Sequence, residues 1–494
     1  MRHRYIDRAA PDYGPQEAAL HPGYSRTKNA REEYEMRLAK WAPPGLAVVA
    51  ALLLASGASP ARSQARVTVF EGARVITGDG SAPIENGAIV VTGDRITAVG
   101  RRSEVAAPAG AARVDITGKT VMPALIDDHV HMGYRRGTSF TADNYTRENL
   151  IDMLDRYAWY GIAAVLETGT GRGDLPYRVR AEARSGARYL TTGSGFGMPN
   201  AGPGGPMRDS AYGVTEEAQV RKYVQELAAH KADMVKIWVD DRNGTVEKLK
   251  PNLYGAIIDE AHKHNLRVMA HTTELADAKD LLRAGLDGFA HMVRDRDVDD
   301  EFLALVKARP NVFFLETLWG ERRAIFTARP AWVDDQALRE AFTAESLQQL
   351  AEQLSPDPKA DPQAVQRSRA MAATNLRNTA KLYAAGARIG LGTDTGGVSG
   401  GQFFGLGSHV ELELLATKVG LTPMQALVVG TRNSAENLGL TDLGTIAAGK
   451  SADFIVLDAN PLDDIANTRR INRVYLRGQE IPRAALSAKW NAKG

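Results

Sequence analysis

The strongest constraint on the fold is a regular alternation of apolar strands and amphipathic helices through the middle of the chain. Helical stretches such as 149–160 and 216–230 separate the strands and carry apolar residues three to four positions apart. Eight alternations over about 320 residues predict an α/β fold of the (β/α)8 TIM barrel type, with a doubly wound open sheet as the alternative. The eight predicted strands are 121–130, 162–168, 188–193, 233–239, 266–271, 286–291, 311–316 and 387–393.

Both flanks of this region are rich in short strands instead. Residues 66–120 and 437–494 contain strand-length apolar runs that are separated by Gly, Asp and Asn turns. Because the flanks share this pattern, we expect them to form one small β-sandwich domain from both chain ends, with the barrel at 121–436. A polar, helical stretch without a strand, at about 322–369, follows the seventh strand and is interpreted as an insertion that covers the site.

The N-terminal region has the three-part layout of a secretory signal. Residues 36–65 begin with basic residues, continue with an apolar run at 46–55, and end in small residues at Ala65. This run is shorter than the ~20 residues that span a bilayer, which favours a cleaved signal over an uncleaved anchor. We therefore expect translation to start at Met36, residues 1–35 to be a non-native extension, and the mature protein to be secreted or periplasmic without a stable membrane span.

Composition excludes several classes of function. Lys and Arg total 61 against 59 Asp and Glu, so no basic excess is present for binding nucleic acid. The chain contains no cysteine, which excludes disulfides, thiolate metal sites and cysteine nucleophiles. Any metal must then be bound by His, Asp, Glu or Lys, and only ten histidines are available.

Six side chains that can bind metal occur at the predicted strand ends, where the active sites of such barrels lie. Two of them, His129 and His131, alternate along one strand, so both imidazoles point to the same face and can reach one cation. A single histidine at a strand end is more often packed or solvated, but six such groups together make coincidence an unconvincing explanation. The six are His129, His131, Lys236, His271, His291 and Asp394. The other histidines, at 3, 21, 230, 262, 264 and 409, have no expected role.

Lys236 requires a separate explanation because it lies inside an apolar strand. An ammonium group there would be desolvated and repelled by a cation. It could remain neutral through a lowered pKa, or its amine could react with carbon dioxide to give a carbamate that bridges two metals. The alternative is a lysine whose ammonium group extends to the strand end and into water.

This order of HxH, Lys, His, His and Asp resembles the amidohydrolase superfamily, in the branch of imidazolonepropionase-related and prolidase-like enzymes. The resemblance runs from GARVITGDG through MPALIDDHVHMG to GTIAAGKSADFIVLD, and thus covers nearly all of the chain after residue 65. Imidazolonepropionase itself usually has one metal and no bridging lysine, so Lys236 points away from that activity. One departure is Ala124, where the family often has glycine.

The resemblance implies a pair of divalent metal ions. His129, His131 and Asp394 would hold one ion, and His271 and His291 would hold the other. Zinc suits such ligands, while manganese, cobalt and iron remain open.

The resemblance also implies how the site would react. A carbamylated Lys236 and a hydroxide would bridge the ions, and the hydroxide would attack an amide carbon. Asp394 would be the catalytic residue that takes the hydroxide proton and passes it to the leaving nitrogen.

Candidates for substrate contacts come from loops. An arginine in the first βα loop could pair with a substrate carboxylate, or could equally be a solvated cation. The loop at 193–207 is rich in Gly and Pro and could form a lid or pocket wall, but lacks the ending of a phosphate-binding loop. A tyrosine after strand four is considered by analogy with family members that carry a polar group there. The candidates are Tyr134, Arg135, Arg136, Tyr254, Trp319 and Arg322.

We therefore expect a metal-dependent amidohydrolase that cleaves the amide C–N bond of an N-acyl amino acid, a dipeptide or a related amide. The same site would also suit an esterase, lactonase or organophosphate hydrolase. A non-catalytic binding protein with this fold is disfavoured, because such proteins typically lose ligands. The sequence leaves the natural substrate and the oligomeric state, including a homo-oligomer, open.

Overall fold

The structure is a computed structural model that describes residues 66–335, 338–355 and 359–492. The expectations for the extension at 1–35 and the signal at 36–65 therefore lie outside the described residues. Within the described ranges, no helix combines the length and the apolar character that a bilayer crossing requires.

Eight parallel strands form the barrel, and each lies within its predicted range. They are β6 (Leu125–Val130), β9 (Ile162–Glu167), β10 (Arg188–Thr191), β13 (Val235–Trp238), β14 (Val268–His271), β15 (Gly288–Phe289), β16 (Phe313–Glu316) and β17 (Arg388–Leu391). The first predicted strand, 121–130, contains two strands, since β5 (Thr120–Pro123) precedes β6 and belongs to a different sheet. The chain changes sheet at Ala124, directly before the strand that carries His129 and His131.

Backbone hydrogen bonds connect two sheets into the barrel. β6, β9 and β10 pair in one sheet, and β13 to β17 pair in sequence order in another. Asp233 N donates to Thr191 O at 3.0 Å and connects β10 to the residues before β13. A parallel bridge between Val130 and Thr395 connects β6 to the residues after β17. The carboxyl ends of β6 and β17 therefore lie next to each other at one mouth of the barrel.

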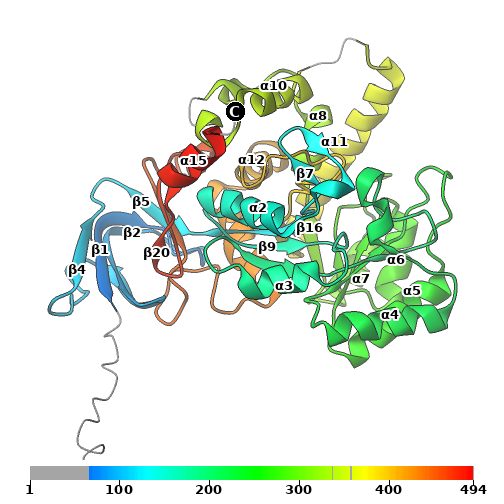
Figure 1. Cartoon of the computed structure of the whole chain (residues 1–494), viewed down its shortest axis with the longest axis horizontal. Coiled ribbons are helices and arrows are strands. Elements are labelled where there is room, and N and C mark those ends of the chain that lie inside the picture. The colour runs from blue at the N-terminus through cyan, green and yellow to red at the C-terminus, as the bar shows by residue number, and fades with distance from the viewer. Residues whose placement is uncertain (1–65, 336–337, 356–358, 493–494) are drawn as a thin grey trace, which may run out of the picture. The chain divides into compact units, whose positions relative to one another are not determined.

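Helices cover the barrel strands because each has an apolar face. In α6, Leu275, Ala278, Leu281 and Leu282 are buried at helical spacing, and the helix ends at Gly285 in the left-handed conformation with φ 105°. Figure 1 shows α2 and α3 beside β9. The helices of the barrel are α2 (Arg147–Trp159), α3 (Leu175–Glu182), α4 (Glu217–Ala229), α5 (Pro251–Lys263), α6 (Leu275–Ala284), α7 (Asp300–Lys307), α11 (Pro362–Ala384), α12 (Leu406–Leu414), α13 (Pro423–Val428) and α14 (Ser434–Leu438).

The stretch after β16 is helical and contains no strand among its described residues. It comprises α8 (Arg322–Ile325), α9 (Leu338–Ala341), α10 (Ala344–Gln353) and the start of α11, with short 3-10 turns at Leu318–Glu321 and Ala331–Asp334. Asp361 caps α11 by accepting from the backbone of Gln363 and Ala364. The helix then continues without a break to the residues before β17, so the predicted boundary at 369 falls inside it. Figure 1 shows α8, α10 and α11 grouped together.

Both chain ends contribute to one further sheet. Its strand order is β20-β19-β18-β5-β1-β2-β3, with β4 paired to β1. The rings of Phe70, Phe454 and Tyr475 pack together inside it, with centroids 4.8–5.1 Å apart. The two-layer sandwich that the sequence predicts is not established by this sheet and stays a prediction. The strands are β1 (Val67–Val75), β2 (Ile84–Thr92), β3 (Arg95–Arg101), β4 (Ala112–Asp115), β5 (Thr120–Pro123), β18 (Phe454–Leu457), β19 (Ile471–Leu476) and β20 (Gln479–Glu480), and α15 (Arg483–Asn491) follows them.

Short strands also lie in the loops. β7 (Arg135–Arg136) pairs with β8 (Ser139–Phe140) in a hairpin that follows β6. β11 (Phe196–Gly197) and β12 (Tyr212–Gly213) extend the barrel sheet next to β13. These short strands belong to the loops that follow β6 and β10, and therefore lie at the barrel mouth formed by the carboxyl ends of the strands.

Candidate metal centre

His129, His131 and Asp394 meet at the barrel mouth. The Nε2 atoms of the two imidazoles are 3.4 Å apart. Asp394 Oδ1 lies 3.0 Å from His131 Nε2 and 3.7 Å from His129 Nε2. His129 Nδ1 lies 2.9 Å from the carbonyl oxygen of Ala290, which can only accept, so Nδ1 carries the hydrogen. The lone pair on His129 Nε2 therefore faces the cluster, as a metal ligand requires.

His291 and His271 lie beside this group. The ring centre of His291 is 4.7 Å from that of His129 and 4.8 Å from that of His271. His291 Nδ1 contacts Thr317 Oγ1 at 2.8 Å, and His271 Nε2 contacts Asp240 Oδ2 at 3.1 Å. One ligand atom from each of His129, His291 and Asp394 lies within 4.8 Å of the other two. The structure thus brings the imidazoles from three strands to one place.

Lys236 lies in the same buried region and has no hydrogen-bond partner. Its side chain is 0% exposed, and Nζ lies 5.4 Å from the ring centre of Trp238. Burial lowers the pKa of Lys236 to about 7, against the opposing fields of Asp394 and Glu167. An ammonium group extended into water is therefore excluded. A neutral amine and a carbamate both remain consistent with this environment.

The electrostatic environment keeps His129, His271 and His291 neutral and Asp394 ionised. Burial, followed by the charges of neighbouring groups, lowers the pKa values of His129 and His291 well below the usual range. Burial also lowers the pKa of His271. Burial raises the pKa of Asp394, but the hydrogen bond and charge of His131 outweigh it and hold that pKa below the usual range. Neutral imidazole and ionised carboxylate are the forms that bind a metal ion.

The backbone around Asp394 is held in a rare conformation. Asp394 has a φ of +55°, in the left-handed region that a side chain seldom adopts. Its backbone N donates to His129 O at 2.9 Å, and Ser399 Oγ donates to its Oδ2 at 2.8 Å. A Cβ placed on Gly400 would lie only 1.7 Å from the Asp394 carbonyl oxygen, so the following loop packs directly on this residue. Such strain, held by its surroundings, is typical of a functional site.

A second layer of buried groups supports the histidines. Glu167 accepts from Thr170 N at 2.6 Å, from Thr170 Oγ1 at 2.5 Å and from Thr191 Oγ1 at 2.7 Å. Because the Thr170 hydroxyl donates to Glu167, its oxygen accepts from His131 Nδ1 at 3.1 Å and leaves Nε2 free for the cluster. The sequence analysis missed Glu167, Thr170 and Asp240. The signal was available, since LETGT ends the second strand and VDD ends the fourth.

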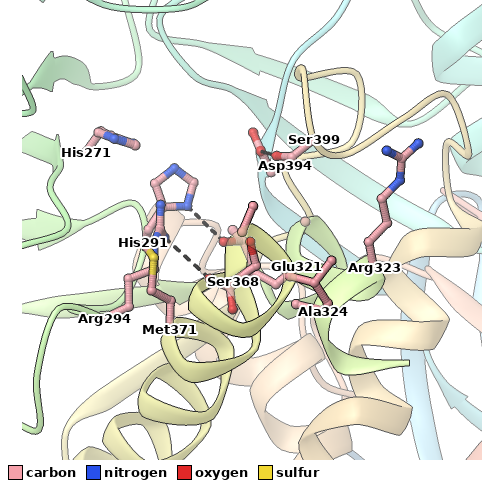
Figure 2. A pocket seen from close by; sticks show the side chains of 14 residues that line it. His271, His291, Arg294, Glu321, Arg323, Ala324, Ser368, Met371, Asp394 and Ser399 are labelled. Atoms are coloured by element: carbon pink, nitrogen blue, oxygen red, sulfur yellow. Dashed lines mark hydrogen bonds and ion pairs between the residues drawn. The ribbon is translucent and has the colours of Figure 1, made fainter. Parts of the chain in front are cut away.

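Two cavities open on the cluster and share four residues: His271, His291, Asp394 and Ser399. The larger, about 460 Å³, is walled by the insertion through Arg323, Ala324, Ala364, Val365, Ser368 and Met371. The smaller, about 160 Å³, is walled by the Gly- and Pro-rich loop through Gly202, Pro203, Gly204 and Met207. Figure 2 shows the larger cavity, with His271 and His291 on one side and Arg323 on the other.

None of the six substrate contacts expected from the sequence lies in the wall of either cavity. Tyr134 is buried and donates through its hydroxyl to Thr170 O at 2.8 Å. Arg136 lines a separate cavity of about 720 Å³ beside α2, and no metal-ligand candidate lines that cavity. Tyr254 is buried on α5, where burial, followed by the charges of Asp280 and Asp277 on α6, raises its pKa. Its position on the outer helix layer keeps it from the strand ends.

The other three expected contacts hold the loop after Asp394 in place. Arg135 Nη2 donates to Gly397 O at 2.8 Å, and its guanidinium lies 3.9 Å from the ring centre of Phe140. Trp319 Nε1 donates to Gly400 O at 3.0 Å. Arg322 is 2% exposed and donates to carbonyl groups. Each of these three side chains thus donates hydrogen bonds to carbonyl groups of the protein and lines neither cavity, and the expectation that they contact a substrate stays a prediction.

Arg323 lines the cavity in place of its neighbour Arg322. Successive side chains on a helix differ by about 100° in direction, so one residue of an Arg-Arg pair can be buried while the other faces the site. The sequence analysis singled out Arg322, whereas the structure places Arg323 in the cavity wall.

Comparisons with known proteins agree with this geometry. A family model described as the amidohydrolase family matches residues 120–481. Ochratoxinase from Aspergillus niger is 26% identical over 451 residues, which cover 81% of this chain and 83% of the relative. Imidazolonepropionase from Streptomyces coelicolor is 25% identical over 407 residues, with 76% and 86% covered. The solved structure of a Xaa-Pro dipeptidase with bound methionine matches with a TM-score of 0.65 at 19% identity, over 84% of this chain and 99% of that chain. The last likeness shows the fold.

Proposed function

The chain belongs to the amidohydrolase family, and from this premise we propose that it hydrolyses an amide carbon–nitrogen bond with two divalent metal ions bound at the barrel mouth. The observation that carries the proposal is the convergence of four imidazoles, a carboxylate and a buried lysine from separate strands. The preferred substrates are small amides such as N-acyl amino acids and dipeptides.

The donor set fits a binuclear metal site. His129, His131 and Asp394 would hold one ion, and His271 and His291 the other. Imidazole nitrogens and an ionised carboxylate oxygen suit zinc, with manganese, cobalt and iron as alternatives. Bound ions would supply activated water at neutral pH and stabilise negative charge on the substrate oxygen.

We propose a carbamylated Lys236 as the bridge between the two positions. A buried amine without a hydrogen-bond partner is costly to keep in the protein. Its lowered pKa provides the neutral form that can react with carbon dioxide. The product is a carboxylate-like group. It would be stabilised by the bound metal ions, whereas the amine has no partner.

Asp394 is the proposed proton carrier. Its low pKa keeps it ionised, so it can accept the proton of the attacking water and return it to the leaving nitrogen. Ser399 Oγ holds Oδ2 at 2.8 Å, which fixes the carboxylate orientation. Residues of the insertion form one wall of the larger cavity.

The proposal is tested by assaying the metal-loaded protein against N-acyl amino acids, dipeptides and matched esters, with metal content per chain measured alongside. We expect amide cleavage and about two ions per chain. The His291→Ala variant should lose metal and activity, whereas His264→Ala, on the exposed end of α5, should retain both. Faster turnover of the matched esters would instead favour the esterase alternative, and binding without any turnover would favour a binding protein.

We also propose that the protein is exported, on the basis of residues 36–65. N-terminal sequencing of the exported protein is expected to find a chain that begins near Arg66. A mature chain that still contains Pro11 or Tyr24 would contradict both the signal and the start at Met36.

A further inference from the structure

Three arginines gather around the loop that follows Asp394. Arg135 comes from β7, and Arg322 and Arg323 come from α8. Burial, then the charges of Arg323 and Arg135, lowers the pKa of Arg322 to about 9, so both of these arginines act on Arg322. Positive charge is thus concentrated at one side of the metal centre.

The partners of the two buried arginines are neutral. Arg135 donates to the carbonyl oxygens of Gly396 and Gly397, and Arg322 donates to those of Trp319 and Ser399. Arg322 also donates to the side-chain oxygen of Gln353, while its Nε has no partner. Within the described ranges, no carboxylate oxygen lies within 4.0 Å of the guanidinium nitrogens of Arg135, Arg322 or Arg323. Carbonyl dipoles satisfy hydrogen bonds but do not neutralise charge.

Asp394 is the carboxylate whose field acts on both Arg135 and Arg322. The Asp394 carboxylate already has partners of its own, because its Oδ1 lies 3.0 Å from His131 Nε2 and its Oδ2 accepts a hydrogen bond from Ser399. The arginine group therefore keeps an excess of positive charge. A buried excess charge is costly unless an anion approaches it.

Only Arg323 of these three lines the larger cavity. Its side chain is exposed, and no ion pair joins it to a carboxylate among the described residues. Figure 2 shows its guanidinium extended from α8, across the cavity from His271. Arg294, the other arginine in the wall, differs because Glu321 Oε1 lies 3.6 Å from its Nη1 and balances its charge.

Apolar side chains lie in the same wall. Ala324, Val365 and Met371 line the larger cavity, and Met371 is 40% exposed. Val398, which is 60% exposed, lines the smaller cavity. These two are the exposed large hydrophobic residues of the described chain, so both cavities offer an apolar surface beside the metal centre.

We propose that Arg323 is the specificity-determining residue and that it selects amides that carry a carboxylate, with an apolar group packed against Met371. This inference rests on the proposed function and narrows its substrate class, because neutral amides of the same shape are discriminated against. Arg135 and Arg322 strengthen the field at the same position without contacting the substrate. The guanidinium fork matches a carboxylate in geometry and charge.

The test compares hippurate with hippuramide, in which a neutral carboxamide replaces the carboxylate. Release of benzoate by the metal-loaded protein is followed by mass spectrometry, and binding of each compound by calorimetry. We expect kcat/KM for hippurate to exceed that for hippuramide by about 10- to 100-fold, mostly through KM. Arg323→Gln should remove this preference, with hippuramide changed less than about threefold.

Arg329→Gln is the matched control. Arg329 belongs to the same insertion, pairs with Asp334 and lines neither cavity, so it should leave the preference intact. Loss of the preference in Arg294→Gln but not in Arg323→Gln would overturn the assignment of Arg323. Equal binding and turnover of the two compounds by the unmodified protein would overturn the inference while leaving amide hydrolysis standing.

Failure of the proposed function has a different signature. If neither compound is cleaved, the proposed activity on such amides fails, and calorimetry still decides the carboxylate preference. Tighter binding of hippurate that disappears in Arg323→Gln supports the inference, and equal binding of hippurate and hippuramide overturns it.

Discussion

The strand ends and the insertion contribute to the same cavity in different ways. His129, His271 and Asp394 come from strands or from the residues directly after them, and their backbones are fixed by neighbouring strands. Arg323 and Met371 come from helices inserted between two strands, and their side chains are exposed. The difference indicates a division of labour, in which the strands supply reaction chemistry and the insertion supplies substrate choice. The following changes test that division.

Metal removal should have the largest effect. A chelator is expected to reduce amide hydrolysis at least about 1000-fold, because activated water and charge stabilisation are both lost. Added zinc should restore the activity, as measured by initial rates. Circular dichroism should show that helices and strands persist, since the barrel core does not depend on the cluster. Full activity after verified metal removal would refute the role of the strand ends.

The Asp394→Asn variant should lower kcat by about 100- to 10,000-fold, because an amide cannot carry the proton. Metal content per chain must be measured on the same sample, since Asp394 is also a proposed ligand. A variant that binds two ions and retains normal kcat would remove Asp394 from the mechanism.

Glu316, at the end of β16, should make stability depend on pH. Burial raises its pKa to about 8 from 4.5, and both carboxylate oxygens lack hydrogen-bond partners. Between these values the unfolded state releases a proton that the folded state keeps, so the free energy of unfolding falls as pH rises from 4.5 to about 8. In Glu316→Gln the free energy of unfolding should not fall over this pH range. At pH 8 it should exceed that of the unmodified protein by a few kcal/mol, since one pKa unit corresponds to about 1.4 kcal/mol.

Urea unfolding at pH 5 and pH 8 measures the effect of Glu316→Gln. The control is Glu148→Gln, because the Glu148 side chain is 80% exposed. An equal free-energy difference between Glu316→Gln and the unmodified protein at both pH values would argue against a buried, protonated Glu316.

The smallest effect is expected for Met371→Ala on α11. It should raise KM for substrates with an apolar group about two- to fivefold, because part of an apolar contact is lost. The melting temperature should hardly change, since the side chain is 40% exposed. Steady-state kinetics check this, and a tenfold fall in kcat would place Met371 in the reaction machinery instead of the wall.

The strands and the metal-binding groups could be predicted because their geometry follows a short period. Side chains alternate along a strand, so the HxH spacing places His129 and His131 together without knowledge of the rest of the fold. The family resemblance that this pattern suggested is confirmed by the match over residues 120–481.

The substrate wall could not be predicted in the same way. Whether Arg322 or Arg323 faces the cavity depends on the rotation of α8, which packing of the insertion decides. Arg135 has a suitable position in the chain, but the carbonyls of the loop after Asp394 occupy its guanidinium. Such choices depend on contacts between distant segments, and a single sequence does not display those contacts.

The pairing of β5 with β18 has a consequence for how the protein is made. Pro123 is opposite Phe454 in that antiparallel pair, and only Ala124 separates β5 from the strand that carries His129 and His131. A ribosome synthesises β18 last among the neighbours of β5, so a nascent chain lacks this support until its final segment emerges. We expect the metal centre to mature late in biosynthesis, and premature termination anywhere before residue 454 to leave its first two ligands poorly anchored.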